Sequence, residues 1–299
     1  MGDFILTLPA IAALRGLQSA HSYRRLEILG YPRIANLAVV TGLADATRSI
    51  EAPSLAPFFT RKSPLSPAEA RYFDQFDLIV SYIHDPERIF AQRVTSVSHA
   101  RYISGKHRPD EASRIHATEV FLRPLMELGI HNADPQPRLM FPEASLYAAD
   151  YAGAEWLAAH PGSGSERKNW PEEKWAALLD TLIQTTSWHL LLVGGEAEGD
   201  RISRLAARLP AGRFKVAQNL PLAELAQQLQ CCIQYIGHDS GITHLAVAVG
   251  LPVVVLWGET VAEIWAPLGP KVALLRNHGG IAAIPVGDVA NAVTAVSSK

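Results

Sequence analysis

The sequence predicts an α/β protein made of two doubly wound halves, each built around a parallel sheet. Short apolar, β-branched runs alternate with amphipathic segments along most of the chain, which is typical of βαβ units. The alternation stops over residues 131–150 and restarts at residue 156. In the second half, polar turns rich in glycine and serine follow apolar strands, where open α/β sheets bind their ligands.

The first half, residues 1–150, is expected to begin with a helix, because Ile5, Leu8 and Ile11 share a broad apolar face. Ser66 with Glu69 three residues later predicts the start of a helix, and Gly129 predicts the end of a long one. The expected helices are 4–20, 32–41, 66–76, 85–94 and 113–128, and the expected strands are 26–29, 47–50, 77–83 and 95–98.

Residues 131–150 contain Pro135, Pro137 and Pro142 and lack periodicity, so they are interpreted as an interdomain linker. The second half, residues 151–299, then alternates regularly. Its expected strands are 156–159, 188–194, 213–217, 233–237, 252–256 and 272–276, and its expected helices are 171–185, 198–208, 221–230, 242–249 and 286–296. Two such halves predict a cleft between them, with ligands at the carboxyl ends of the strands.

The most informative stretch is 237–258, which contains a polar turn, a helix of small residues and a buried strand. Asp239, Ser240 and Gly241 form the turn and lie at a helix N-terminus. Free N–H groups and the helix dipole make such a position suitable for an anion. His244 lies about one helical turn further along, at the same end.

A second segment has the same design. The expected strand 156–159 leads into a Gly/Ser loop that contains Lys168, and Pro171 stands in the first turn of the next helix. A flexible loop with a cation, placed between a strand and a helix, suits a diphosphate. The spacing is not that of a Walker loop.

Composition excludes several classes of protein. The formal net charge is −2, which argues against nucleic acid as the main partner. The two cysteines, Cys231 and Cys232, are adjacent, so a disulfide framework is not expected. The sequence therefore predicts a protein of a reducing compartment. No apolar stretch reaches the length of a membrane span, and no leader peptide is apparent. A cytoplasmic protein is expected, with any membrane contact peripheral. No metal site is expected, because the histidines are not spaced as metal ligands.

Four segments together resemble glycosyltransferase family 9, the heptosyltransferase family of lipopolysaccharide core assembly. They occur in a specific order and spacing along nearly the whole chain. The segments are 2–15, with Gly2-Asp3; 160–175, with His160-Pro-Gly-Ser and Lys168-Asn-Trp-Pro; 191–196, with Gly-Gly-Glu196; and 239–260, with Asp239-Ser-Gly-Ile-Thr-His244 and Gly258-Glu-Thr260.

The resemblance implies a GT-B fold, with two Rossmann-like domains facing a cleft. It implies an inverting, metal-independent transfer of a sugar from a nucleotide-diphospho sugar, most often ADP-heptose, to a lipopolysaccharide-core or related saccharide. The acceptor, a free or lipid-linked saccharide, would bind to residues 1–150, and the donor would bind to residues 151–299. The reaction would take place at the inner face of the cytoplasmic membrane. No cofactor is implied, and the lack of an Asp-x-Asp triplet fits metal-free transfer.

The resemblance also assigns roles to individual residues. Asp3 would be the general base, Lys168 would contact the diphosphate and Glu196 would bind the ribose. Asp239, with the amides that follow it, would hold the sugar and phosphate region. The donor-binding residues implied in this way are Ser163, Lys168, Glu196, Asp239, Ser240, Gly241 and His244.

Simpler interpretations of the same residues stay open. Asp3 is also a favoured helix N-cap, Lys168 could be a solvated loop lysine, and Glu196 could cap a helix. His244 could be a hydrogen-bonded core histidine, whereas capping and ligand binding by Asp239 are compatible.

The chain departs from the family pattern at its start, where a hydrophobic strand and a glycine-bearing loop are expected before Gly2. The first strand of a doubly wound sheet is normally central. Its apparent absence predicts neighbouring strands without partners, or another segment in its place.

Two other functions fit the same scaffold. A sugar-nucleotide epimerase would need no acceptor, and a truncated or non-catalytic nucleotide-sugar-binding protein would bind the donor without transfer. A dinucleotide oxidoreductase ranks last, because no GxGxxG follows a strand. The spacing of residues 237–241 is GxxSG rather than GxSxG, which excludes a serine hydrolase of the nucleophile-elbow type.

Overall fold

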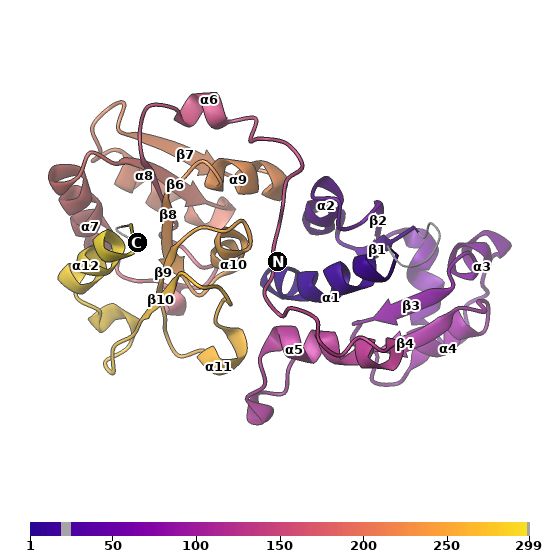
Figure 1. Ribbon diagram of the computed structural model, residues 1–299. Helices are drawn as coiled ribbons and strands as arrows, with labels where there is room; N and C mark the ends of the chain where they lie inside the picture. Colours follow the sequence, from indigo (N-terminus) through magenta and orange to yellow (C-terminus); the bar gives the residue numbers. More distant parts are fainter. Residues whose placement is uncertain (19–24, 298–299) are drawn as a thin grey trace.

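The computed structural model describes residues 1–18 and 25–297. Its strands form three parallel sheets: two of two strands in the first part of the chain and one of six strands in the second part (Figure 1). The strands are β1 Glu27–Gly30, β2 Ala46–Ser49, β3 Leu78–Ser81, β4 Arg101–Ser104, β5 Trp156–Ala159, β6 His189–Gly194, β7 Phe214–Gln218, β8 Gln234–His238, β9 Val253–Leu256 and β10 Val272–Leu275.

Helices connect most of these strands. The α-helices are α1 Gly2–Gln18, α2 Pro32–Val40, α3 Pro67–Asp74, α4 Ile89–Thr95, α5 Ala117–Leu122, α6 Ala148–Tyr151, α7 Glu172–Thr185, α8 Gly199–Ala206, α9 Leu222–Leu229, α10 Gly241–Ala248, α11 Ala262–Trp265 and α12 Val286–Ser297. Six 3₁₀ segments are described: η1 Pro53–Phe59, η2 Glu111–Ser113, η3 Arg123–Leu128, η4 Glu166–Lys168, η5 Glu196–Glu198 and η6 Ile281–Ala283. Within the described ranges, no helix has the combination of length and apolar character that crossing a bilayer requires.

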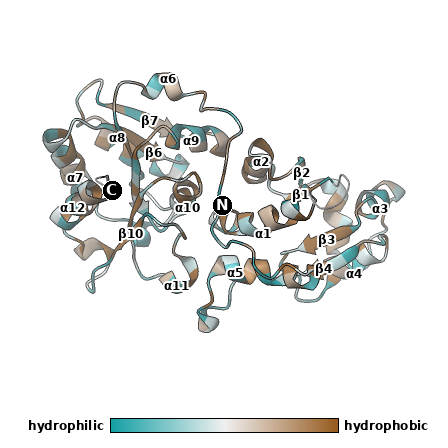
Figure 2. Ribbon diagram, viewed as in Figure 1, coloured by the Kyte–Doolittle hydropathy of each residue, from teal (hydrophilic) through white to brown (hydrophobic). Residues whose placement is uncertain are grey.

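The six-stranded sheet has the order β10-β9-β8-β5-β6-β7. From β5 the chain moves outward through β6 and β7, then returns to the other side of β5 with β8, so the direction of winding reverses between β5 and β8. Such a reversal leaves room for a ligand beyond the carboxyl ends of the two strands. β5, β8 and β9 are buried along their whole length, as expected for parallel strands covered on both faces. Figure 2 shows α10, which covers one face, as a hydrophobic ribbon.

The first part of the chain is less regular. Within the described ranges, β1 pairs with β2 and β3 pairs with β4, and these strands are half-buried or exposed for the most part. Helix α1 packs against α5 and against α10 of the second part, and Ile5, Leu6 and Leu8 join the core that includes α10. Residues 1 and 2 therefore contact the start of α10, at the carboxyl ends of the strands of the large sheet (Figure 1).

The predicted elements of the second half are all confirmed to within two residues. In the first half, the predicted strands 26–29, 47–50 and 77–83 and the helices 32–41 and 66–76 are confirmed to the same precision. The helix predicted over 4–20 is observed as Gly2–Gln18, and its residues 19 and 20 lie outside the described ranges.

Three predictions of the first half are wrong. Residues 95–98 end a helix, with the Thr95 hydroxyl bonded to the Ala91 carbonyl, and the strand begins only at Arg101, whose amide bonds the carbonyl of Asp77. The helix predicted over 113–128 is broken into η2, α5 and η3, with Pro124 at the start of η3. The helix predicted over 85–94 begins at Ile89, because Arg88 before it has left-handed backbone angles.

Candidate active site

The predicted donor-binding residues follow three neighbouring strands of the six-stranded sheet. Asp239 follows β8, the loop that contains Ser163 and Lys168 follows β5, and Glu196 follows β6. Because β8, β5 and β6 are adjacent and parallel, these residues share one edge of the sheet. That edge includes the point between β5 and β8 where the winding reverses.

Lys168 and Asp239 form an ion pair across that point. The Lys168 Nζ lies 2.6 Å from Asp239 Oδ2, and the Thr260 hydroxyl donates to the same oxygen over 2.6 Å. The Asp239 side chain is 11 % exposed, whereas that of Lys168 is 41 % exposed. Asp239 is thus fixed through one carboxylate oxygen, and Lys168 keeps contact with solvent, where a charged ligand could reach it.

The N-terminus of α10 lies directly beside this ion pair. Ser240 is the N-cap, and its hydroxyl accepts a hydrogen bond from the Thr243 amide over 3.4 Å. The first N–H groups of the helix have no partner within it, so they can bind an anion. His244 is buried one turn in, and burial lowers its pKa to about 4 although Asp239 acts in the opposite direction. At neutral pH His244 is therefore uncharged.

Asp3 is an exposed residue in the first turn of α1. Its neighbour Gly2 lies against α10, since a Cβ added to Gly2 would be 3.7 Å from both Gly241 Cα and His244 Cδ2. In the other direction, a Cβ on Gly241 would be 2.9 Å from the Gly2 nitrogen. Glycine at position 241 lets the two helix N-termini meet, which brings the turn with Asp3 to the candidate site.

Ser163 and Glu196 belong to the same edge but make no contact with the ion pair. The Ser163 hydroxyl is hydrogen-bonded within its own loop, to Asn169 Oδ1 at 2.7 Å and to the Ser165 carbonyl at 2.9 Å. Glu196 is exposed at the start of η5, after β6. The structure therefore brings Lys168, Asp239, Ser240, Gly241 and His244 together and leaves these two at the periphery.

Two buried polar residues that the sequence analysis did not select support the loops of the site. Glu198 is 7 % exposed and accepts hydrogen bonds from the amides of Gly164, at 3.2 Å, and Gly195, at 3.0 Å. His238, the last residue of β8, is fully buried beneath the loop that carries Lys168. Both bind backbone groups of a distant loop, so periodicity and motifs gave no signal for them; an ionisable residue at the end of a buried strand is the one hint available.

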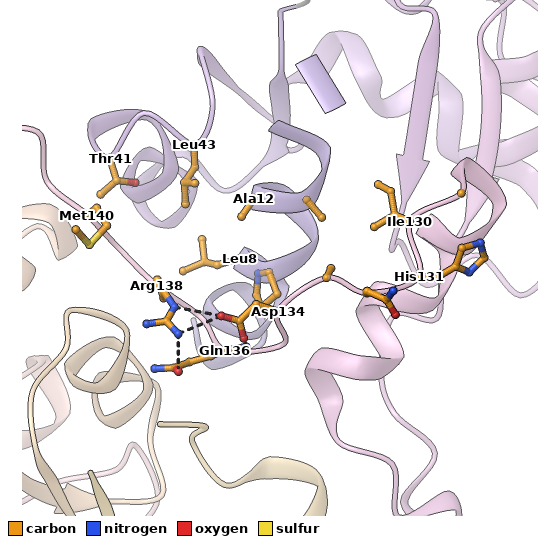
Figure 3. Close-up of a pocket in the computed structure, with 15 residues that line it drawn as sticks. Leu8, Ala12, Thr41, Leu43, Ile130, His131, Asp134, Gln136, Arg138 and Met140 are labelled. Atoms are coloured by element: carbon orange, nitrogen blue, oxygen red, sulfur yellow. Dashed lines mark hydrogen bonds and ion pairs between the residues drawn. The ribbon is translucent and has the colours of Figure 1, made fainter. Parts of the chain in front are cut away.

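A cavity of about 640 Å³ lies elsewhere, between α1 and the segment that crosses from the first part of the chain to the second (Figure 3). Leu8, Ala12 and Leu43 contribute apolar side chains, and Arg138 and Asp134 form an ion pair at its rim. None of the predicted site residues lines it. In the described ranges, no group of three or more His, Cys, Asp or Glu side chains is arranged to hold a metal ion.

The family model described as Glycosyltransferase family 9 (heptosyltransferase) matches residues 104–283, more than half of the chain. The chain belongs to this family. The match includes the loop with Lys168, the Gly-Gly-Glu196 turn and the N-terminus of α10.

Curated relatives of this family member share parts of the sequence. Lipopolysaccharide heptosyltransferase 1 of Pseudomonas aeruginosa is 34 % identical over 109 residues, which are 36 % of this chain and 30 % of that protein. Lipopolysaccharide heptosyltransferase 2 of Salmonella typhimurium is 25 % identical over 164 residues, 52 % of this chain and 47 % of the relative. The matched part thus spans between 30 % and 47 % of the length of these relatives.

Solved structures of the family match over the whole chain. The glycosyl transferase family 9 protein of Veillonella parvula has a TM-score of 0.79 at 17 % identity, covering 100 % of this chain and 94 % of the other. The ADP-heptose heptosyltransferase II of Escherichia coli has a TM-score of 0.76 at 15 % identity, covering 99 % and 96 %. These likenesses confirm the GT-B fold that the sequence predicted.

Proposed function

We propose that the protein is an inverting, metal-independent glycosyltransferase that moves a sugar, heptose from ADP-heptose, to a lipopolysaccharide-core or related saccharide. The observation that carries the proposal is the pairing of Lys168 with Asp239 beside the N-terminus of α10, within the segment matched by the family model. We further propose that residues 151–299 bind the donor and residues 1–150 the acceptor.

The proposed chemistry requires stabilisation of a leaving diphosphate. Displacement at the anomeric carbon breaks the bond to the diphosphate oxygen, which gains negative charge as the bond lengthens. The Lys168 ammonium and the free N–H groups at the start of α10 are suitable donors to that oxygen. His244 is neutral at physiological pH and would contribute hydrogen bonding rather than charge.

The acceptor hydroxyl must lose its proton as its oxygen forms the new bond. We assign the general base to Asp3, which is exposed in the first turn of α1 and belongs to the helix end that meets α10. The acceptor would attack from the face opposite the leaving diphosphate, which inverts the anomeric centre. Asp239 uses one oxygen for Lys168 and Thr260, so its second oxygen is available for a hydroxyl of the donor sugar.

A calorimetric titration with ADP, UDP, GDP and dTDP tests the donor site. Selective binding of ADP is expected, and Lys168→Ala should weaken it at least tenfold, because a hydrogen bond to a charged group contributes about 1.5–3 kcal/mol. Lys271→Ala is the matched control: Lys271 is an exposed lysine just before β10, at the opposite edge of the sheet. Equal binding by wild type and Lys168→Ala would refute the assignment of the diphosphate.

Transfer itself is tested with Asp3→Asn, which should lose turnover by a factor of 10² or more while ADP still binds. Asp288→Asn is the control, since Asp288 is an exposed acid in the first turn of another helix, α12. Unchanged turnover in Asp3→Asn would exclude Asp3 as the base. Conversion of the donor sugar without any acceptor would favour an epimerase, and donor binding without transfer to any acceptor would favour a binding protein.

A further inference from the structure

His238 binds the backbone of the donor loop at both of its ends. The loop runs from β5 to α7 and carries Lys168. The His238 Nδ1 lies 3.0 Å from the Gly162 carbonyl oxygen, and the Trp170 amide donates to His238 Nε2 over 2.9 Å. The indole N–H of Trp175 also donates to Nε2, over 3.3 Å. The His238 side chain thus joins the two ends of the loop, an arrangement of hydrogen bonds called the bracket.

These contacts fix the protonation state of the imidazole. Nε2 faces two N–H donors, so it must present a lone pair, and Nδ1 faces a carbonyl oxygen, so it must carry the proton. His238 is fully buried, and its ring makes an edge-to-face contact with Trp175 at a centroid distance of 5.4 Å. The neutral tautomer with hydrogen on Nδ1 satisfies every contact. The charged form would also carry a hydrogen on Nε2, which would face the N–H groups of Trp170 and Trp175.

The loop needs such a support because its own sequence does not rigidify it. It contains two glycines, and Gly164 has a φ of +72°, a conformation that other residues rarely adopt. Apart from the short η4 segment, its backbone forms no regular structure. Support comes from outside the loop: His238 and Glu198 hold the loop backbone, and Asp239 holds the side chain of Lys168.

We propose that His238 is a positioning residue of the donor site: as a neutral imidazole it holds residues 162–170 so that Lys168 can meet the diphosphate. The proposal rests on the proposed function for its effect on binding. The bracket itself can be tested without any ligand.

The ligand-free test uses nuclear magnetic resonance of the full chain labelled with ¹⁵N. A scalar coupling through the hydrogen bond between the Trp170 amide nitrogen and His238 Nε2 is expected. The ring should carry its proton on Nδ1 and should not titrate between pH 5 and pH 8. A proton on Nε2, or titration within that range, would overturn the bracket whether or not the protein binds nucleotides.

The functional test compares three substitutions. His238→Asn can still donate to Gly162 and His238→Gln can still accept from Trp170, whereas His238→Leu can do neither. The affinity for ADP should fall by about tenfold for each lost end of the bracket, so Leu should be the weakest binder. Hydrogen exchange at the amides of residues 163–170 should rise in the same order.

The matched control is Leu179→Ala, which removes contacts from the same buried cluster, one helical turn beyond Trp175 on α7. It should lower thermal stability but leave ADP affinity and loop exchange near their wild-type values. Equal loss of affinity in Leu179→Ala and His238→Leu, or equal affinity in the Leu, Asn and Gln variants, would overturn the positioning role. Failure of wild type to bind any of the four nucleotides, with the coupling present, would count against the proposed function alone.

Discussion

Three histidines buried beneath the candidate site should make the second half of the molecule sensitive to mild acid. Burial lowers the pKa of His160 to about 4, that of His238 to about 3 and that of His244 to about 4. In the unfolded chain a histidine has a pKa near 6.5. The unfolded state therefore binds more protons than the folded state at any pH below about 6.5.

The sign and size of the effect follow from this difference. Stability is fully present above the unfolded pKa and is lost as the pH falls from about 6.5 toward the folded values. By pH 5 each histidine should cost about 2 kcal/mol, since a pKa unit corresponds to 1.36 kcal/mol, and the three together roughly 6 kcal/mol. Because domains are stable by about 5–15 kcal/mol, this loss is a large share of the total.

Urea denaturation followed by tryptophan fluorescence at pH 7, 6 and 5 measures the effect. All six tryptophans lie in the second half of the chain, so the signal reports on the six-stranded sheet and its helices. The carboxyl groups held in ion pairs, such as Glu166 and Glu172, have lowered pKa values and lose their contributions only below about pH 4.5. The interval from pH 7 to pH 5 therefore isolates the histidines.

A free energy of unfolding that stays constant from pH 7 to pH 5 would refute this account of the buried histidines. A variant supplies an internal check: in His238→Gln, which cannot take up a proton, the slope of stability against pH should fall by up to about one third of its wild-type value, since the buried His116 also has a lowered pKa. An unchanged slope in that variant would show that the pKa of His238 is the same in the folded and unfolded states, which would contradict its lowering by burial.

Two further substitutions probe the site. Thr260→Val removes the hydroxyl that fixes Asp239 and should weaken donor binding about tenfold, whereas Thr260→Ser should keep the wild-type affinity. Calorimetric titration with the donor measures both variants, and equal affinities of Thr260→Val and wild type would refute the role of the hydroxyl. Gly162→Ala would place its Cβ 2.1 Å from Glu198 Cγ and should cost about 1–3 kcal/mol of stability as well as ADP binding. Gly258→Ala is the control, because a Cβ at that position meets open space, and it should change neither stability nor ADP binding. Similar melting curves for the two alanine variants would contradict the predicted clash at Gly162.

The second half of the fold could be predicted from sequence because its strands are buried on both faces. Runs such as 253–256 are apolar throughout and bounded by glycine or proline, so few alternatives compete. Strands β1, β2 and β3 of the first half are only half-buried, which weakens their pattern. The strand predicted at 95–98 failed for that reason: Val94 and Val97 are apolar, but Val94 completes the buried face of α4.

The site divides in a similar way. Lys168 and Asp239 stand in motifs whose residue types and spacing indicate an anion site, and the fold places them in contact. His238 lay beyond prediction because it acts on backbone groups more than 30 residues away. Glu198 also accepts from the nearby Gly195 amide, but only the tertiary structure shows its bond to the distant Gly164 amide. Loop-supporting residues of this kind leave no periodic signal, since their partners are amides and carbonyls that every residue possesses.

The meeting of α1 and α10 gives the site its electrostatic character. Two helix N-termini, each equivalent to about half a positive charge, approach through Gly2 and Gly241, and such ends repel one another unless an anion lies near. Asp3 in the first turn of α1 and Asp239 before α10 supply negative charge on either side of the junction. Asp239 is already neutralised by Lys168, so the field at the junction remains favourable to a further anion. A bound diphosphate would therefore stabilise the contact between the two halves of the molecule while it is itself stabilised, which couples donor binding to the placement of Asp3.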